Sequence, residues 1–246
     1  VFNLAIRMLG TPDHAEDATQ EILLKVVTHL ATFERKSAFS TWVYRIALNH
    51  LLNVRAKSDL ERERTFASFG ALIDMGIASF DRQAAVQVDQ VLRNEVRLNC
   101  THAMLVCLER PERAAFILGA ILELGGEEAA DLLGVSHSVY RKRLSRARDR
   151  LHAFMQQRCG LYAEENPCRC ARQVPFIQSA GKLDPAALVY AELEVSDPQR
   201  AKAGAEQREF IGLMDTVQVI DTQPDYFVDD GLMDRLRGVL QRESPS

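Results

Sequence analysis

A basic stretch, residues 137–152, holds the side chains best suited to binding nucleic acid. It contains six basic residues and one acidic residue, a local net charge of +5. Arginine and lysine neutralise phosphates, and from the start of a helix they also reach base edges in the major groove. The expected base contacts are His137, Ser138, Arg141 and Lys142, and the expected phosphate contacts are Arg146, Arg148 and Arg150.

The preceding residues predict how this basic helix is positioned. Residues 127–133 form a first helix, and Gly134 then allows the positive φ of a tight turn. Ala130 is small where two helices approach closely, and Ser136 is a natural N-cap for the second helix. The layout is that of a helix-turn-helix, and the alternative is a solvated amphipathic helix after an unrelated helical hairpin.

Aromatic side chains gather in a second stretch, beside basic and amide side chains. Aromatic rings next to such groups suit stacking on unpaired bases. The alternative is that the rings are core residues, which is the expectation for Phe33 and Phe39. The stretch contains Phe33, Phe39, Trp42, Tyr44, Arg45 and Asn49.

A third group combines three cysteines with one histidine, namely Cys159, Cys168, Cys170 and His152. Three thiols and an imidazole could hold zinc, but the spacing matches no paired Cys-x-x-Cys arrangement. A packed or redox-active thiol cluster is the favoured alternative. The five cysteines are too few and too unevenly placed for a disulfide framework.

Composition indicates an ordinary globular chain. Its 246 residues are 47% hydrophobic and 26% charged, which fits two compact units and excludes a mainly disordered protein. The net charge of −4 argues against nucleic-acid binding only as an average, because residues 186–246 alone carry twelve acidic and six basic side chains. No apolar stretch is long enough to span a membrane and no secretory signal is seen, so we expect a cytoplasmic protein without a membrane partner.

Helical periodicity and the lack of alternating strand patterns predict an all-α fold. The chain starts on a helical pattern, so we expect its native N-terminus to be missing. Asp13 is the expected N-cap of the next helix, and a helical break is expected at Pro111. The predicted helices include 14–30, 40–56, 201–219 and 231–241.

Two blocks of the sequence resemble the extracytoplasmic-function sigma factors of bacterial RNA polymerase. Residues 17–24 and 39–49 are similar to region two of that family, and residues 128–136 and 143–151 to region four. The resemblance implies two small helical domains: 1–57 as region two with a truncated N-terminus, and 95–156 as region four with the helix-turn-helix. Residues 58–94 would be a linker with one or two short helices, and residues 157–246 a mostly helical C-terminal extension.

The resemblance implies a promoter-specificity subunit that is not an enzyme and needs no cofactor. It implies core RNA polymerase and promoter DNA as partners, and an anti-sigma factor or the chain's own extension as a regulator. The core-binding residues would be Asp17, Gln20, Glu21 and Leu24. The minus-ten contacts would be Phe39, Trp42, Tyr44, Arg45 and Asn49, and the minus-thirty-five contacts Ser136, His137, Ser138, Arg141, Lys142 and Arg146.

The sequence departs from the family pattern at Tyr140 and at residues 137–139, so promoter preference does not transfer. A stand-alone helix-turn-helix regulator is the main alternative, but it does not require the block at residues 17–24. An enzymatic site in the extension is not supported, because that part has no histidine and no glycine-rich phosphate loop. We expect the extension to pack against the sigma domains as a built-in regulator; the alternative is an appended domain that only stabilises the fold.

Overall fold

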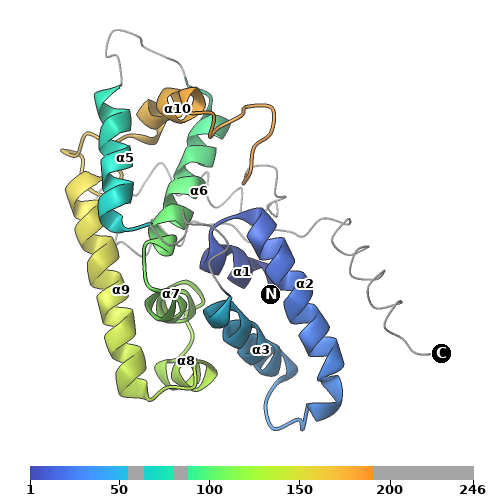
Figure 1. Ribbon diagram of the computed structural model, residues 1–246. Helices are drawn as coiled ribbons and strands as arrows, with labels where there is room; N and C mark the ends of the chain where they lie inside the picture. The colour runs from blue at the N-terminus through green and yellow to red at the C-terminus, as the bar shows by residue number, and fades with distance from the viewer. Residues whose placement is uncertain (55–63, 80–87, 191–246) are drawn as a thin grey trace.

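The computed structural model describes residues 1–54, 64–79 and 88–190. Regular structure in these ranges is helical, apart from two isolated β-bridges, which confirms the predicted all-α fold. Figure 1 shows the helices α1, α2 and α3 beside α7 and α8, with α9 along the opposite edge and α5, α6 and α10 together at one end.

The first three helices form an N-terminal group. They are α1 (Phe2–Leu9), α2 (Pro12–Thr28) and α3 (Phe39–Asn53), with a short 3-10 helix, Leu30–Thr32, after α2. The prediction of Asp13 as the N-cap of α2 is wrong, because Thr11 takes that position. Pro12 stands in the first turn, where its fixed φ suits a helix start and its missing N–H costs nothing.

The second group contains the helix-turn-helix. Its helices are α6 (Gln90–Val106), α7 (Arg110–Phe116), α8 (Gly126–Leu132) and α9 (His137–Arg158), and α7 continues into a π-helical turn, Ile117–Ile121. The break expected at Pro111 is confirmed, since α6 ends at Val106 and Pro111 stands in the first turn of α7.

Two further helices complete the described fold. Helix α5 (Phe66–Ala78) lies inside the expected linker, and a reciprocal Thr65–Ser68 capping box fixes its start. Helix α10 (Cys170–Ser179) lies in the extension and was not predicted. It packs against α5 and α6, and Gln173 Nε2 donates to the Ile73 carbonyl at 3.1 Å. The helices predicted at 201–219 and 231–241 lie outside the described residues.

The two helical groups share one hydrophobic core. Leu4, Ile22 and Leu48 of the N-terminal group belong to the same buried cluster as Ile117 and Tyr140 of the second group. A second cluster joins α5, α6, α7 and α9 around Phe116 and Leu151. The two groups are therefore in direct contact in this conformation, although residues 58–94 were expected to link two separate domains.

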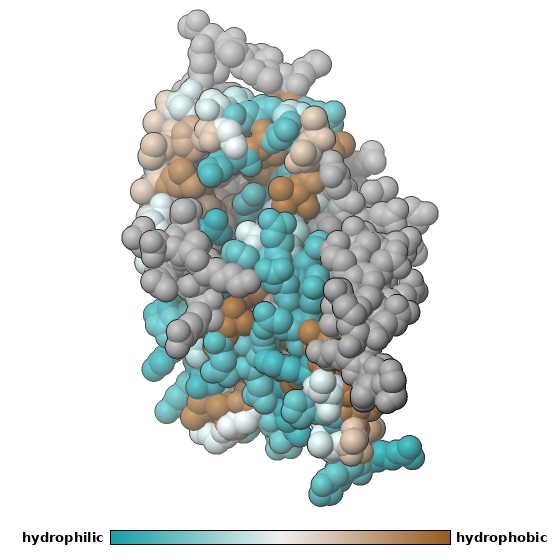
Figure 2. All heavy atoms as spheres, turned by 45° about the vertical axis from the view of Figure 1, so that its right-hand side comes forward, coloured by the Kyte–Doolittle hydropathy of each residue, from teal (hydrophilic) through white to brown (hydrophobic). Residues whose placement is uncertain are grey.

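None of the helices in the described ranges is long and apolar enough to cross a membrane. On the face seen in Figure 2, the described residues form a broad hydrophilic band with smaller hydrophobic patches beside it. That face is therefore dominated by polar side chains.

Candidate nucleic-acid interface

The turn between α8 and α9 has the geometry that its sequence predicts. Gly134 has φ of +61°, and the N–H of Val135 donates to the Ala130 carbonyl at 3.0 Å. Ser136 caps α9, because its Oγ accepts the N–H of Val139 at 3.4 Å. These local bonds fix the angle at which α9 leaves the turn.

Helix α9 has one buried face and one basic face. Tyr140, Ala147 and Leu151 are buried against the rest of the domain. A Cβ at residue 119 would lie 2.0 Å from the Tyr140 hydroxyl, so the absence of a side chain at Gly119 makes room for this ring. The predicted DNA contacts lie exposed on α9 and at its cap: Ser136, His137, Ser138, Arg141, Lys142 and Arg146.

Arg150 is also exposed, but its guanidinium is paired within the protein. Its guanidinium pairs with the Glu112 carboxylate of α7 at 3.0 Å and lies 3.9 Å from Glu109. The Glu112 side chain is only 7% exposed, so this pair lies at the edge of the core. Arg150 therefore joins α7 to α9 through an ion pair, and its phosphate contact stays a prediction.

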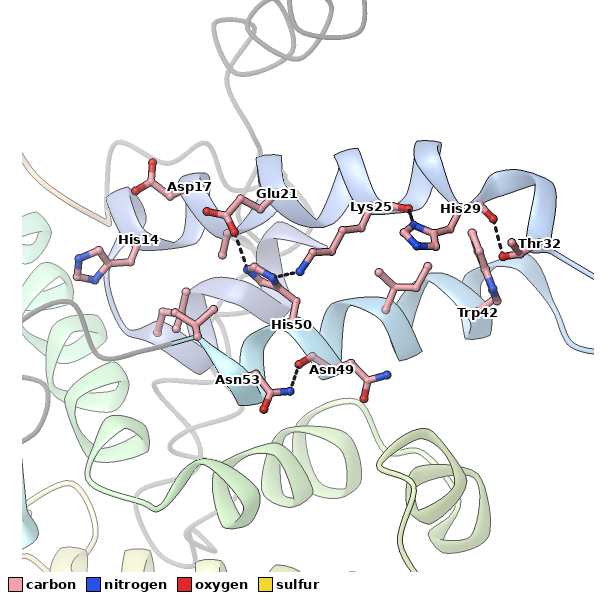
Figure 3. A pocket seen from close by; sticks show the side chains of 14 residues that line it. His14, Asp17, Glu21, Lys25, His29, Thr32, Trp42, Asn49, His50 and Asn53 are labelled. Atoms are coloured by element: carbon pink, nitrogen blue, oxygen red, sulfur yellow. Dashed lines mark hydrogen bonds and ion pairs between the residues drawn. The ribbon is translucent and has the colours of Figure 1, made fainter. Parts of the chain in front are cut away.

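A groove of about 700 Å³ lies between α2 and α3, which are in contact with each other (Figure 3). Asp17 and Glu21 line it from α2, and Trp42 and Asn49 from α3. The groove therefore brings two of the predicted core-binding residues together with two of the predicted minus-ten residues. Gln20 and Leu24, the other predicted core contacts, are half-buried on α2.

His50 joins the two walls of this groove (Figure 3). Its Nδ1 lies 2.7 Å from Lys25 Nζ and its Nε2 lies 3.5 Å from a Glu21 oxygen. Burial and the Lys25 charge lower the pKa of His50, and Glu21 partly opposes them. A neutral ring accepts from Lys25 at Nδ1 and presents Nε2–H to Glu21. Sequence reasoning missed this residue, because its role depends on contact between two helices.

The aromatic residues gather at the end of the α2–α3 hairpin where the chain connects the two helices. The ring centroids of Phe33, Phe39 and Trp42 lie 5.4 to 5.8 Å apart. Phe39 is 48% exposed, so the expectation that it belongs to the core is wrong, while Phe33 is half-buried. An exposed ring held by two aromatic neighbours offers a flat surface on which a base can stack.

Tyr44 and Arg45 make other contacts. Tyr44 packs against the shared core, and Arg45 Nη2 bonds Asp131 Oδ2 of α8 at 2.7 Å. The predicted minus-ten residues are therefore divided between the aromatic end, the groove and the contact with α8. Sequence reasoning did not predict the Arg45–Asp131 pair, whose members lie 86 positions apart.

The cysteines gather where α9, α10 and α6 meet. The backbones of Cys159 and Cys168 pair in an isolated β-bridge, and both thiols are free. Burial together with neighbouring thiols raises the pKa of Cys168 to about 11 and that of Cys170 to about 12. Cys100 of α6 joins them, a member that spacing had not indicated. These thiols stay protonated at neutral pH, which fits a packed cluster.

The predicted zinc ligands do not assemble into a metal site. The Tyr162 hydroxyl lies 2.8 Å from His152 Nδ1. Within residues 1–54, 64–79 and 88–190, no group of three or more histidine, cysteine or acidic side chains is placed to hold a metal ion. The structure therefore gives no support to the zinc hypothesis.

Comparison with known proteins identifies both helical groups. The family described as Sigma-70 region 2 matches residues 1–61, and the family described as Sigma-70, region 4 matches residues 98–151. The extension lies beyond both matches.

Among similar proteins is the ECF RNA polymerase sigma factor SigW of Bacillus subtilis, 25% identical over 61% of this chain and 80% of its own length. The ECF RNA polymerase sigma factor SigE of Mycolicibacterium smegmatis is 30% identical over 63% of this chain and 57% of its own length. The solved structure of Bartonella quintana RpoE in complex with the anti-sigma factor NepR aligns at 24% identity with a TM-score of 0.42, covering 63% of this chain and 89% of that one.

Proposed function

Because the chain belongs to the extracytoplasmic-function sigma factors of the sigma-70 family, we propose that it binds core RNA polymerase and directs it to promoters in the cytoplasm. It is a transcription initiation factor and not an enzyme. The observation that carries the proposal is that two family blocks, in the family order, fold as the elements the function requires. A stand-alone regulator is not favoured, because it needs α9 but not the region two block.

We assign core binding to the exposed edge of α2 that borders the groove. Asp17 and Glu21 are exposed carboxylates one helical turn apart, and Gln20 and Leu24 flank them. Carboxylates spaced in this way attract a basic surface and guide its approach. The contact of the Glu21 carboxylate with His50 Nε2 holds this edge in fixed register with α3.

We assign the minus-ten contacts to α3 and to the aromatic end of the hairpin. Phe39 and Trp42 offer rings to an unstacked base, and capturing such a base offsets an unstacking cost of a few kcal/mol. Asn49 adds an exposed amide, and Arg45 a guanidinium once it leaves Asp131. Tyr44 supports the helix from its core side.

We assign the minus-thirty-five contacts to the first turns of α9. Ser136, His137, Ser138, Arg141 and Lys142 point away from the core at the helix start, where a recognition helix meets base edges. Arg146 is exposed one turn further on, where its guanidinium can pair with a phosphate.

The test is reconstitution with core polymerase. The full chain should form a stoichiometric complex with core and support promoter-dependent transcription. Asp17→Ala should weaken core binding about tenfold, while Asp13→Ala, an exposed aspartate on the same helix, should not. If neither the wild-type chain nor any of its variants binds core, the proposal is rejected.

DNA reading is tested on the same complex. Lys142→Ala should reduce binding to a duplex with the minus-thirty-five element by about 1–3 kcal/mol. Lys182→Ala, an exposed lysine in the extension, is the matched control and should leave this affinity unchanged. Equal losses for the two variants would show that the effect is one of net charge only.

A further inference from the structure

The last described residue of the extension is buried between the two helical groups. Tyr190 is 2% exposed, and its hydroxyl donates to the Gly10 carbonyl at 2.6 Å. Its ring stacks on His102 of α6 with centroids 4.7 Å apart and planes 10° apart. Gly10 ends α1, in the N-terminal group, so one side chain contacts both groups.

A buried carboxylate holds the backbone of the same segment. Glu95 of α6 is 2% exposed. Its Oε1 accepts the N–H of Val189 at 2.9 Å, and both of its oxygens accept the N–H of Tyr190 at 3.0 Å. Hydrogen bonds to an ionised acceptor are among the stronger ones in proteins, so the segment is fixed in both position and direction.

The extension is anchored before it reaches Tyr190. Val174 of α10 and Leu183 pack against Val96 of α6 in a separate buried cluster, and Leu188 packs on its edge. The segment 183–190 therefore runs along α6 from this cluster to Gly10, and Tyr190 makes its contact with the N-terminal group.

The contact between the groups conflicts with simultaneous promoter binding. Elements centred 10 and 35 base pairs upstream lie about 25 base pairs apart, which is about 85 Å of duplex. In this structure Arg45, an assigned minus-ten residue, is bonded to Asp131. Asp131 is in turn at most about 18 Å of chain away from Ser136, an assigned minus-thirty-five residue. The two assigned DNA surfaces must therefore move apart before both elements are bound.

We propose that residues 183–190 form a clasp, in which Tyr190 holds the N-terminal group closed on the helix-turn-helix group and limits polymerase and promoter access. The proposal rests on the proposed function and names the regulation of the same surfaces. The apparent affinity of a protein falls by the fraction of molecules that are competent to bind. Release of the clasp therefore raises affinity without creating any new contact with core.

The experiment compares three variants of the full chain. Tyr190→Ala removes the ring and the hydroxyl, and Tyr190→Phe removes only the bond to Gly10. Val189→Ala is the matched control, because its side chain is 44% exposed and its N–H bond to Glu95 is kept. Core affinity and the radius of gyration from small-angle scattering are measured for each.

We expect Tyr190→Ala to bind core at least about tenfold more tightly than wild type and to have a larger radius of gyration. Tyr190→Phe should gain about fivefold, the effect of one net hydrogen bond. Val189→Ala should match wild type in both measurements.

An unchanged affinity and radius for Tyr190→Ala would overturn the clasp. If circular dichroism shows that this variant is unfolded, Tyr190→Phe decides by the same two measurements. If wild type and all variants fail to bind core, the proposed function fails, while the radius of gyration still decides whether the clasp exists.

Discussion

Arg113 shows how a single side chain joins three backbone segments. It is 6% exposed, and its guanidinium donates to the carbonyls of Val106 at 2.6 Å, Leu108 at 2.8 Å, and Met8. These carbonyls lie at or just beyond the C-terminal ends of α6 and α1, where intrahelical partners are missing and the helix dipole is negative. One cation therefore satisfies acceptors in both helical groups.

Replacing Arg113 by Met should lower the free energy of unfolding by about 3 kcal/mol or more, because three buried carbonyls lose their donor. Urea denaturation followed by circular dichroism measures this loss as a lower midpoint with an unchanged slope. Arg141→Met, on the exposed face of α9, is the control and should change the midpoint little. Similar losses for both variants would show that the Arg113 bonds add nothing to stability.

At the scale of elements, the features that were predicted correctly are set by residues close together in the sequence. The glycine turn and the serine cap before α9 depend on residues adjacent in sequence, as does the break at Pro111, and each was found where expected. Helix α10 was missed because Pro175 interrupts its pattern and its buried face exists only against α5 and α6. The contact of Tyr190 with Glu95 was missed for a similar reason, since the two residues are 95 positions apart.

The candidate site was likewise only partly predictable. The exposed face of α9, to which we assign DNA binding, follows from helical periodicity, because the buried positions leave the others outside. The roles of His50, Arg45 and Arg150 do not follow, because each is set by a partner on another helix. Side chains that join elements are therefore the part of this site that required the structure.

The turn before α9 offers a test at this scale. Gly134 has φ of +61° and open space where a Cβ would stand, so substitution there costs backbone strain without a clash. Gly134→Ala should lower the free energy of unfolding by about 1–2 kcal/mol, and Gly134→Asn by less, because asparagine tolerates the left-handed region. Thermal denaturation of the two variants checks the order, and equal costs would mean that the turn relaxes to negative φ.

At the scale of the whole molecule, charge is divided along the chain while packing joins its parts. The basic helix α9 and the acidic residues 186–246 give the chain opposite local charges, although its net charge is only −4. The described packing keeps the N-terminal group, α6 and the extension together through a buried junction of Tyr190, Glu95 and His102. Because His102 in this junction is buried, we expect the stability of the fold to depend on pH.

Burial and the nearby Arg7 charge lower the pKa of His102 from 6.5 to about 3. Between these values the unfolded chain binds a proton that the folded chain does not, so stability is present above pH 6.5 and declines as pH falls. The decline should be up to about 1.4 kcal/mol per pH unit. Urea midpoints at pH 7, 6 and 5 measure it against His102→Phe, which keeps a ring to stack on Tyr190 but cannot titrate. The carboxylates titrate in both proteins, so only the difference between them reports on His102. Parallel pH profiles would show that His102 is not held neutral, and a steeper loss in wild type would assign that part of the pH dependence of stability to this ring.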